Sequence, residues 1–133
     1  MLHRVLIVDD AAFVREVLAQ ILLKHGFEVC GEAQNGAEAV EMAVSKKPDL
    51  ILMDIVMPLK SGIQAAEEIL KINSSMPIIA CSTEGSETMV AKAIGAGCVD
   101  FVVKPFQIEN LIATIKKVLN KKTNKEQEAK GEI

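Results

Sequence analysis

The sequence predicts an α/β fold in which five β–α units build a parallel sheet. Short apolar runs of strand length alternate along the chain with segments whose apolar residues recur at helical spacing. Short connections join these segments, and such β–α units form a parallel sheet with helices on both faces. Polar side chains directly follow several apolar runs, at the edge where open α/β sheets bind ligands. The periodicity leaves the strand order open.

The first two units occupy residues 4–47. Residues 4–8 are an apolar, largely β-branched strand, and Gly26 should end the helix that follows. Residues 28–33 are more polar, which is typical of an edge strand, and Asn35 is the expected N-cap of the second helix. The apolar residues that recur at helical spacing in these two helices are Phe13, Val17, Leu18, Ile21, Leu22, Val40, Ala43 and Val44.

The remaining three units follow the same pattern. Strands are expected at residues 49–54, 77–82 and 99–104, and Ser61 should begin the helix after the first of them. A small-residue helix should end near Gly95, and the final helix is expected over residues 108–119.

Composition limits the class of protein. The 133 residues fit one domain, half of them are apolar, and no apolar run reaches the length needed to span a membrane. The chain has no Trp or Tyr and a net charge of −3, which argues against a nucleic-acid platform. The first strand leaves no room for a signal peptide, so we expect a cytoplasmic protein. Reduced thiols are expected at Cys30, Cys81 and Cys98.

Polar residues at the ends of the predicted strands suggest a single site. Asp54 ends the strand at 49–54, and Pro58 prevents that strand from continuing. The pair at 9–10 follows the first strand, while Ser82 and Lys104 end the fourth and fifth. If the sheet has a doubly wound order, these side chains converge at one edge.

Three carboxylates in one cleft repel each other, so they should have raised pKa values or hold a cation. Their oxygens suit Mg²⁺ better than zinc, because His3 and His25 lie outside the group. Lys104 adds a positive charge, and the Ser82 hydroxyl can donate to a phosphoryl oxygen. Such a site suits in-line transfer of a phosphoryl group onto a carboxylate.

The residues at 8–10, 53–58, 82 and 104–106 together resemble the receiver domains of two-component response regulators, and Arg15 fits that pattern. The resemblance covers about residues 2–120 and is strongest to the stand-alone chemotaxis regulators of the family. It implies a flavodoxin-like (βα)5 three-layer sandwich, with a parallel five-stranded sheet in the order 2-1-3-4-5. We therefore expect a receiver domain at 1–120, a flexible charged tail at 121–133, and no attached output domain.

The resemblance also implies roles for individual residues. Asp54 would accept a phosphoryl group from a histidine kinase. The implied Mg²⁺ ligands are Asp10 directly, Asp9 through water, Asp54, and the Val56 carbonyl.

Ser82 and Lys104 would hold the phosphoryl oxygens, and the bond before Pro105 should be cis. Phosphorylation would draw Ser82 inward and let Phe101 rotate inward, altering the face formed by the fourth helix, fifth strand and fifth helix.

The expected function is that of a single-domain response regulator in chemotaxis, which signals to the flagellar motor switch protein. It would be no enzyme beyond slow autophosphorylation and autodephosphorylation. The expected partners are a histidine kinase, the motor switch protein and a phosphatase, and we expect a monomer that binds neither nucleic acid nor membrane.

Three alternatives remain. A sporulation-type phosphorelay intermediate would pass the phosphoryl group onward. A phosphatase of the haloacid dehalogenase type would need an acid two residues after Asp54, where this chain has Val56. A flavodoxin-like FMN binder would need a phosphate loop after the first strand, where the acid pair would repel phosphate.

Several positions depart from the family pattern. Phe101 stands where many members have Tyr, and Thr83 where Ala or Gly is common. Val56 offers no polar group to orient a hydrolytic water, while Glu84 is expected near the path of that water. We expect slow loss of the phosphoryl group.

Overall fold

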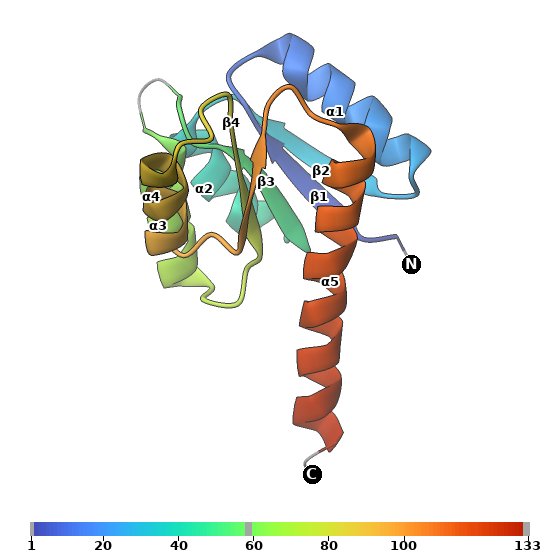
Figure 1. Ribbon diagram of the computed structural model, residues 1–133. Coiled ribbons are helices and arrows are strands. Elements are labelled where there is room, and N and C mark those ends of the chain that lie inside the picture. Colours follow the sequence, from blue (N-terminus) through green and yellow to red (C-terminus); the bar gives the residue numbers. More distant parts are fainter. Residues whose placement is uncertain (1, 58–59, 132–133) are drawn as a thin grey trace.

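The computed structural model describes residues 2–57 and 60–131, and it describes side chains as far as residue 123. Strands and helices alternate along the chain as the sequence predicts (Figure 1). The elements are β1 (Arg4–Val8), α1 (Ala12–Lys24), β2 (Glu28–Ala33), α2 (Gly36–Ser45), β3 (Leu50–Asp54), α3 (Gly62–Ile72), β4 (Ile78–Ser82), α4 (Glu87–Gly95), β5 (Asp100–Val103) and α5 (Ile108–Gly131).

All neighbouring strands pair in parallel, in the order β2-β1-β3-β4-β5. This order confirms the fold that the resemblance implied, and it places the polar strand β2 at an edge. The register pairs Val8 of β1 with Met53 of β3, and Asp54 with Cys81 of β4. The carboxyl ends of the three central strands therefore lie side by side.

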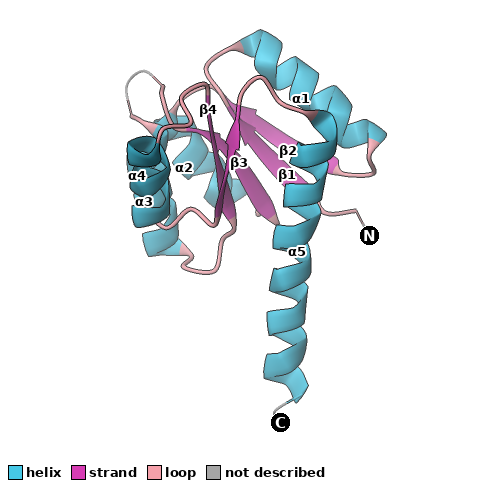
Figure 2. Cartoon of the chain, viewed as in Figure 1, coloured by secondary structure: helices cyan, strands magenta, loops and turns pink. Residues whose placement is uncertain are grey.

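Helices cover both faces of the sheet, so the molecule has three layers (Figure 2). On one face, Leu18 and Leu22 of α1 and Leu111 and Ile115 of α5 join the same buried cluster. On the other face, residues of α2, α3 and α4 form a second cluster, which includes Ala39, Ala66, Ile69 and Ala93. Both faces of the central strands are buried, which explains why their sequences are almost wholly apolar.

Side-chain caps begin three of the helices. The Asn35 side chain accepts a hydrogen bond from the Glu38 N–H at 2.9 Å, which confirms the predicted N-cap of α2. Ser61 begins α3 with a capping box, and Ser86 caps α4. In contrast, α1 begins after Ala11, which has no side chain able to cap the helix.

The apolar pattern of α1 is wider than the face that it buries. Leu18 and Leu22 are buried, but Phe13 is 75% exposed and Val17 is 36% exposed. Phe13 and Val17 form a stripe of their own, four residues apart and beside the stripe that faces the sheet. Val44 of α2 is likewise exposed.

The final helix is longer than the apolar pattern predicts. It continues to Gly131 (Figure 1), although Leu119 is the last buried residue among its described side chains. Whether residues 121–133 are flexible in solution stays a prediction. Within the described ranges, no helix combines the length and apolar character required to cross a membrane.

Candidate functional site

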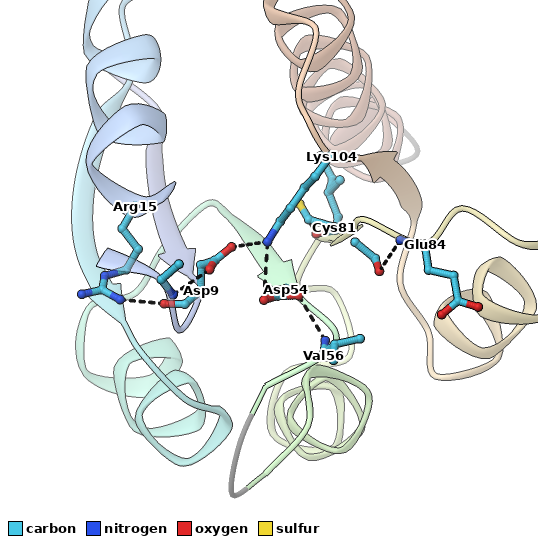
Figure 3. Close-up of polar contacts among 10 residues, drawn as sticks. Asp9, Arg15, Asp54, Val56, Cys81, Glu84 and Lys104 are labelled. Carbon is cyan, nitrogen blue, oxygen red and sulfur yellow. Dashed lines mark hydrogen bonds and ion pairs between the residues drawn. The ribbon is translucent and has the colours of Figure 1, made fainter. Parts of the chain in front are cut away.

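The polar residues singled out in the sequence gather at the carboxyl edge of the sheet (Figure 3). Asp9 directly follows β1, Asp54 and Ser82 are the last residues of β3 and β4, and Lys104 directly follows β5. Asp9, Asp54 and Ser82 are buried, which is unusual for polar side chains without a function. The convergence that the sequence predicted is therefore present.

Three carboxylates form the centre of the site. Asp9, Asp10 and Asp54 each offer an oxygen, and these oxygens all lie within 4.8 Å of one another. Asp10 is exposed whereas the other two are buried, so the group is open to solvent on one side. An open group of oxygen donors fits Mg²⁺, which keeps several waters and takes few protein ligands. These residues could therefore hold such an ion.

Asp9 is held through both of its carboxylate oxygens and through its backbone. Its Oδ1 accepts a hydrogen bond from the Ala11 N–H at 2.9 Å, and its Oδ2 pairs with the Lys104 ammonium. Its backbone carbonyl accepts a hydrogen bond from Arg15 Nη1 at 2.7 Å. Arg15 Nε in turn lies 3.3 Å from Glu32 Oε1. The sequence indicated Arg15 only through the resemblance, and Glu32, at the end of strand β2, was missed.

Lys104 links two of the acids. Its Nζ pairs with Asp9 and lies 3.5 Å from Asp54 Oδ2 (Figure 3). Burial disfavours the charged ammonium, but the hydrogen bond to Asp9 and the attraction of both carboxylates outweigh it. The pKa of Lys104 is therefore raised, and the side chain stays charged at neutral pH.

Asp54 has a raised pKa, chiefly because burial disfavours its charged form. The Val56 N–H donates to Asp54 Oδ1 at 3.1 Å and, with Lys104, partly offsets this effect. Repulsion by Asp9 also raises the pKa but is a smaller cause. The sequence predicted a raised pKa through repulsion among the acids, whereas burial is the main cause.

Of the two residues expected near Asp54 on the path of the hydrolytic water, Val56 lies beside it, whereas the Glu84 carboxylate does not. Val56 is 59% exposed, and its backbone lies beside the carboxylate. Ser82 Oγ accepts a hydrogen bond from the Glu84 N–H at 3.1 Å. The Glu84 carboxylate, however, accepts a hydrogen bond from Ser86 Oγ at 3.4 Å and points away from Asp54 (Figure 3).

Phe101 is half-buried and packs against the cluster between the sheet and helices α2 to α4. The bond between Lys104 and Pro105 is cis, as the resemblance implied. The Lys104 N–H donates to the Ser82 carbonyl at 2.8 Å, which ties the end of β5 to the end of β4. Ser82 and Lys104, the two residues expected to hold the phosphoryl oxygens, are thus joined through the backbone.

The three cysteines are free, as predicted. Cys81 lies next to Asp54 in the sheet, and burial raises the pKa of its thiol to about 12. Burial likewise raises the pKa of Cys98 to about 11. Neither thiol therefore supplies a thiolate at neutral pH.

A large groove lies away from these residues. Its volume is about 790 Å³, and it lies at the opposite edge of the sheet, near Pro77, Asp100 and Lys121. The acid cluster does not line it. We assign the chemistry to the acid cluster, because charged side chains converge there.

Comparison with known proteins agrees with this geometry. Residues 5–116 match the response regulator receiver domain. The chemotaxis protein CheY of Bacillus subtilis (strain 168) is 52% identical over 120 residues, which cover 90% of this chain and 100% of that protein. The CheY of Thermotoga maritima is 53% identical over 115 residues, covering 86% and 96% of the two chains.

Solved structures of CheY and of a CheY-like receiver domain resemble this chain in fold. The CheX–CheY–BeF3–Mg complex of Borrelia burgdorferi has a TM-score of 0.84 to this chain at 30% identity, covering 87% of this chain and 88% of that one. A CheY-like receiver domain of Methanospirillum hungatei has a TM-score of 0.87 at 26% identity, covering 94% and 99%.

Proposed function

The chain belongs to the family of response regulator receiver domains and is a CheY-like response regulator of a two-component system, and we propose that it receives its phosphoryl group on Asp54. Its identity to CheY proteins supports a role in chemotaxis. The observation that carries the assignment of Asp54 is its position. It is a buried carboxylate that lies beside two further acids and 3.5 Å from the Lys104 ammonium.

The other two acids are less suited to act as the nucleophile. Both carboxylate oxygens of Asp9 are already engaged, by the Ala11 N–H and by Lys104. Asp10 is exposed. Asp54 Oδ2 has only the longer contact with Lys104, so this oxygen is the one most available to attack phosphorus.

In the proposed step, an Asp54 oxygen forms a bond to phosphorus while the phosphorus–nitrogen bond of a phosphohistidine breaks, and the imidazole keeps the electron pair. Lys104 moves its charge toward the incoming phosphoryl oxygens, and the Ser82 hydroxyl donates to one of them. Asp9, Asp10, Asp54 and the Val56 carbonyl would hold Mg²⁺, which supplies positive charge to offset the repulsion between a carboxylate and a phosphoryl group.

Phosphorylation would change the contacts of Ser82, and this change can reach the surface of the protein. The Ser82 hydroxyl now accepts from the Glu84 N–H, and donating to a phosphoryl oxygen would draw this segment toward Asp54. Phe101 lies half-buried on the next strand, where space vacated by that shift would let it turn inward. We propose that the resulting population shift changes the face formed by α4, β5 and α5.

The proposed phosphodonor is a histidine kinase, and the proposed target is the flagellar motor switch protein. A phosphatase is proposed as a further partner, because Val56 offers no polar group that could orient a hydrolytic water. The Borrelia burgdorferi relative is described in a complex with CheX, so a CheY-like protein can hold a second protein. We place the protein in the cytoplasm as a monomer, with no catalytic turnover beyond slow autophosphorylation and autodephosphorylation.

Acetyl phosphate and Mg²⁺ test the assignment directly. The wild-type chain should gain one phosphoryl group, mapped to Asp54 by mass spectrometry, and omission of Mg²⁺ should prevent it. Asp54→Asn should remain unlabelled, while Asp49→Asn, which changes an aspartate at the opposite edge of the sheet, should label normally. Labelling that persists in Asp54→Asn would overturn the assignment.

A further inference from the structure

The loop between β1 and α1 carries two of the three acids but lacks a usual anchor. Helices α2, α3 and α4 begin with a capping side chain from Asn35, Ser61 and Ser86. In α1 that position is Ala11, which has no polar side chain. Other contacts must therefore hold the loop in place.

The carboxylate of Asp9 provides part of that support. Its Oδ1 accepts from the Ala11 N–H and its Oδ2 pairs with Lys104. Both contacts use oxygens that a cation would compete for. A phosphoryl group on Asp54 would also draw Lys104 away from Asp9. The contacts that the Asp9 carboxylate makes with Ala11 and Lys104 are therefore weakened when a cation binds or Asp54 is phosphorylated.

The bond from Arg15 to the Asp9 backbone does not have this weakness. Arg15 Nη1 donates to the Asp9 carbonyl at 2.7 Å, and this oxygen plays no part in the acid cluster. Figure 3 shows the guanidinium reaching the loop from the side opposite Lys104. The contact can thus persist while the carboxylate changes partners.

Arg15 is itself held in place. Only 16% of its side chain is exposed, and its Nε lies 3.3 Å from Glu32 Oε1 on β2. The Asp9 N–H also donates to the Ala33 carbonyl at 3.0 Å, so the loop is tied to the same strand by its backbone. The guanidinium donates to the carbonyl through Nη1 and is attracted to the Glu32 carboxylate by charge, although Nε itself makes no hydrogen bond.

We propose that Arg15 is a positioning residue that holds the Asp9–Asp10 loop ready for a divalent cation, and that Glu32 orients it. The proposal rests on the proposed function, because it assumes that the acid cluster binds Mg²⁺. Residues that orient metal ligands without touching the metal typically change its affinity about 10- to 100-fold when replaced. Arg15→Gln should therefore weaken Mg²⁺ binding about tenfold.

The chain offers a matched control at the opposite edge of the sheet. Arg4 Nε lies 3.5 Å from Glu28 Oε2, so it pairs with a glutamate on the same strand β2. Arg4→Gln removes the same kind of ion pair without touching the acid loop. It should leave the Mg²⁺ dissociation constant within about twofold of wild type, whatever it does to the melting temperature.

Calorimetric titration of the full chain with Mg²⁺ provides the readout, since the chain has no Trp or Tyr to report by fluorescence. Melting temperatures in EDTA separate loss of folding from loss of binding. Arg15→Lys should give an intermediate dissociation constant, because an ammonium can donate to the carbonyl but lacks the planar guanidinium that lies beside Glu32 at the same time. This variant also tests the proposal if Arg15→Gln fails to fold.

Three results would overturn the proposal. The first is that Arg15→Gln or Arg15→Lys binds Mg²⁺ as tightly as wild type, and the second is that Arg4→Gln weakens binding as much as Arg15→Gln. In either case wild-type binding stands and only the role of Arg15 fails. If wild type itself binds no Mg²⁺, the proposed cation site fails and the role of Arg15 fails with it.

Discussion

At the scale of single residues, burial of the Asp54 carboxylate lowers the stability of the folded protein at neutral pH. The pKa of Asp54 is raised above its ordinary value of 3.8, mainly by burial. The folded state then binds more protons than the unfolded state between these two pKa values. The contribution of Asp54 to the free energy of unfolding therefore falls as the pH rises above about 3.8, and the loss is complete above the raised pKa of the folded state.

Asp54→Asn should accordingly stabilise the protein without Mg²⁺. At pH 7 we expect a gain on the order of 1 kcal/mol, because the amide removes a buried charge while Lys104 keeps its partner Asp9. Thermal unfolding in EDTA from pH 7 down to pH 4 measures it. The gain should shrink as the pH falls, and a gain independent of pH would show that packing, not ionisation, is the cause.

We expect the lifetime of the proposed phosphoryl group to depend on Val56, at the same edge of the sheet. Val56 is 59% exposed beside Asp54 and has no polar atom in its side chain. Val56→Asn should place an amide where it can orient a water, and so shorten the lifetime several-fold, which is less than the ~10²-fold of a well-placed general base. Decay of the phosphorylated chain in Mg²⁺ buffer gives the rate.

Glu84→Gln is the comparison for this change. Its carboxylate is bonded to Ser86 and points away from Asp54, so its removal should leave the decay rate unchanged. If Glu84→Gln changes the decay rate and Val56→Asn does not, the hydrolytic water is oriented by Glu84, after β4, and not by the residue at position 56.

At the scale of the elements, helix α3 sets the position of Asp54. Gly62 begins α3, and a Cβ at this residue would collide with the Asp54 carbonyl oxygen and come within 2.6 Å of Ile55 Cα. These are backbone atoms, so no side-chain rotation relieves the overlap. Glycine is therefore required where the helix approaches the end of β3.

Gly62→Ala should destabilise the protein by about 1–3 kcal/mol and slow phosphorylation, because the overlap displaces the peptide of Asp54, the proposed acceptor. Gly95→Ala is the matched control. A Cβ there meets nothing within 4 Å, and alanine favours a helix, so stability should stay equal or rise slightly. Denaturant unfolding measures both. Equal stability of the two variants would contradict the proposed packing.

Most of the elements could be predicted because their signals are local. The apolar runs located all five strands to within one or two residues, and Asn35 marked the start of α2 through its own side chain. Ends of parallel strands share one edge whatever the detailed packing. This is why Asp9, Asp54 and Lys104 could be assigned to one site.

The remainder depends on contacts that no local pattern contains. The exposure of Phe13 follows from how α1 is rotated on the sheet. The close pairing of Lys104 with Asp9, the orientation of Glu84 and the contact of Arg15 with a backbone carbonyl are set by distances between separate elements. The dominant cause of the raised pKa of Asp54 is burial, which requires the packed structure.

At the scale of the whole molecule, the body of the fold ends before helix α5 does. Val118 and Leu119 are buried, whereas Lys121 and Thr123 are exposed, and Lys122 reaches back only to the Asp49 carbonyl at 3.5 Å. We therefore expect the core to be complete without the residues that follow 123.

A chain shortened by removal of residues 124–133 should keep its melting temperature and its rate of phosphorylation. Leu119→Ala in the same shortened chain should cost about 2–5 kcal/mol, because it empties a buried position. Thermal unfolding and labelling by acetyl phosphate measure both. Loss of stability on shortening alone would show that the last turns of α5 contribute to the fold.

The two faces of the sheet are also covered by helices at different stages of synthesis. The face under α2, α3 and α4 is covered by helices from the middle of the chain, whereas the other needs both α1 and α5. As the ribosome extends the chain, Leu18 and Leu22 have no partner on α5 until Leu111 and Ile115 emerge. Helix α1 can pack against β1 and β2 as soon as these strands emerge, whereas the part of this face that α5 covers stays open until the end of synthesis.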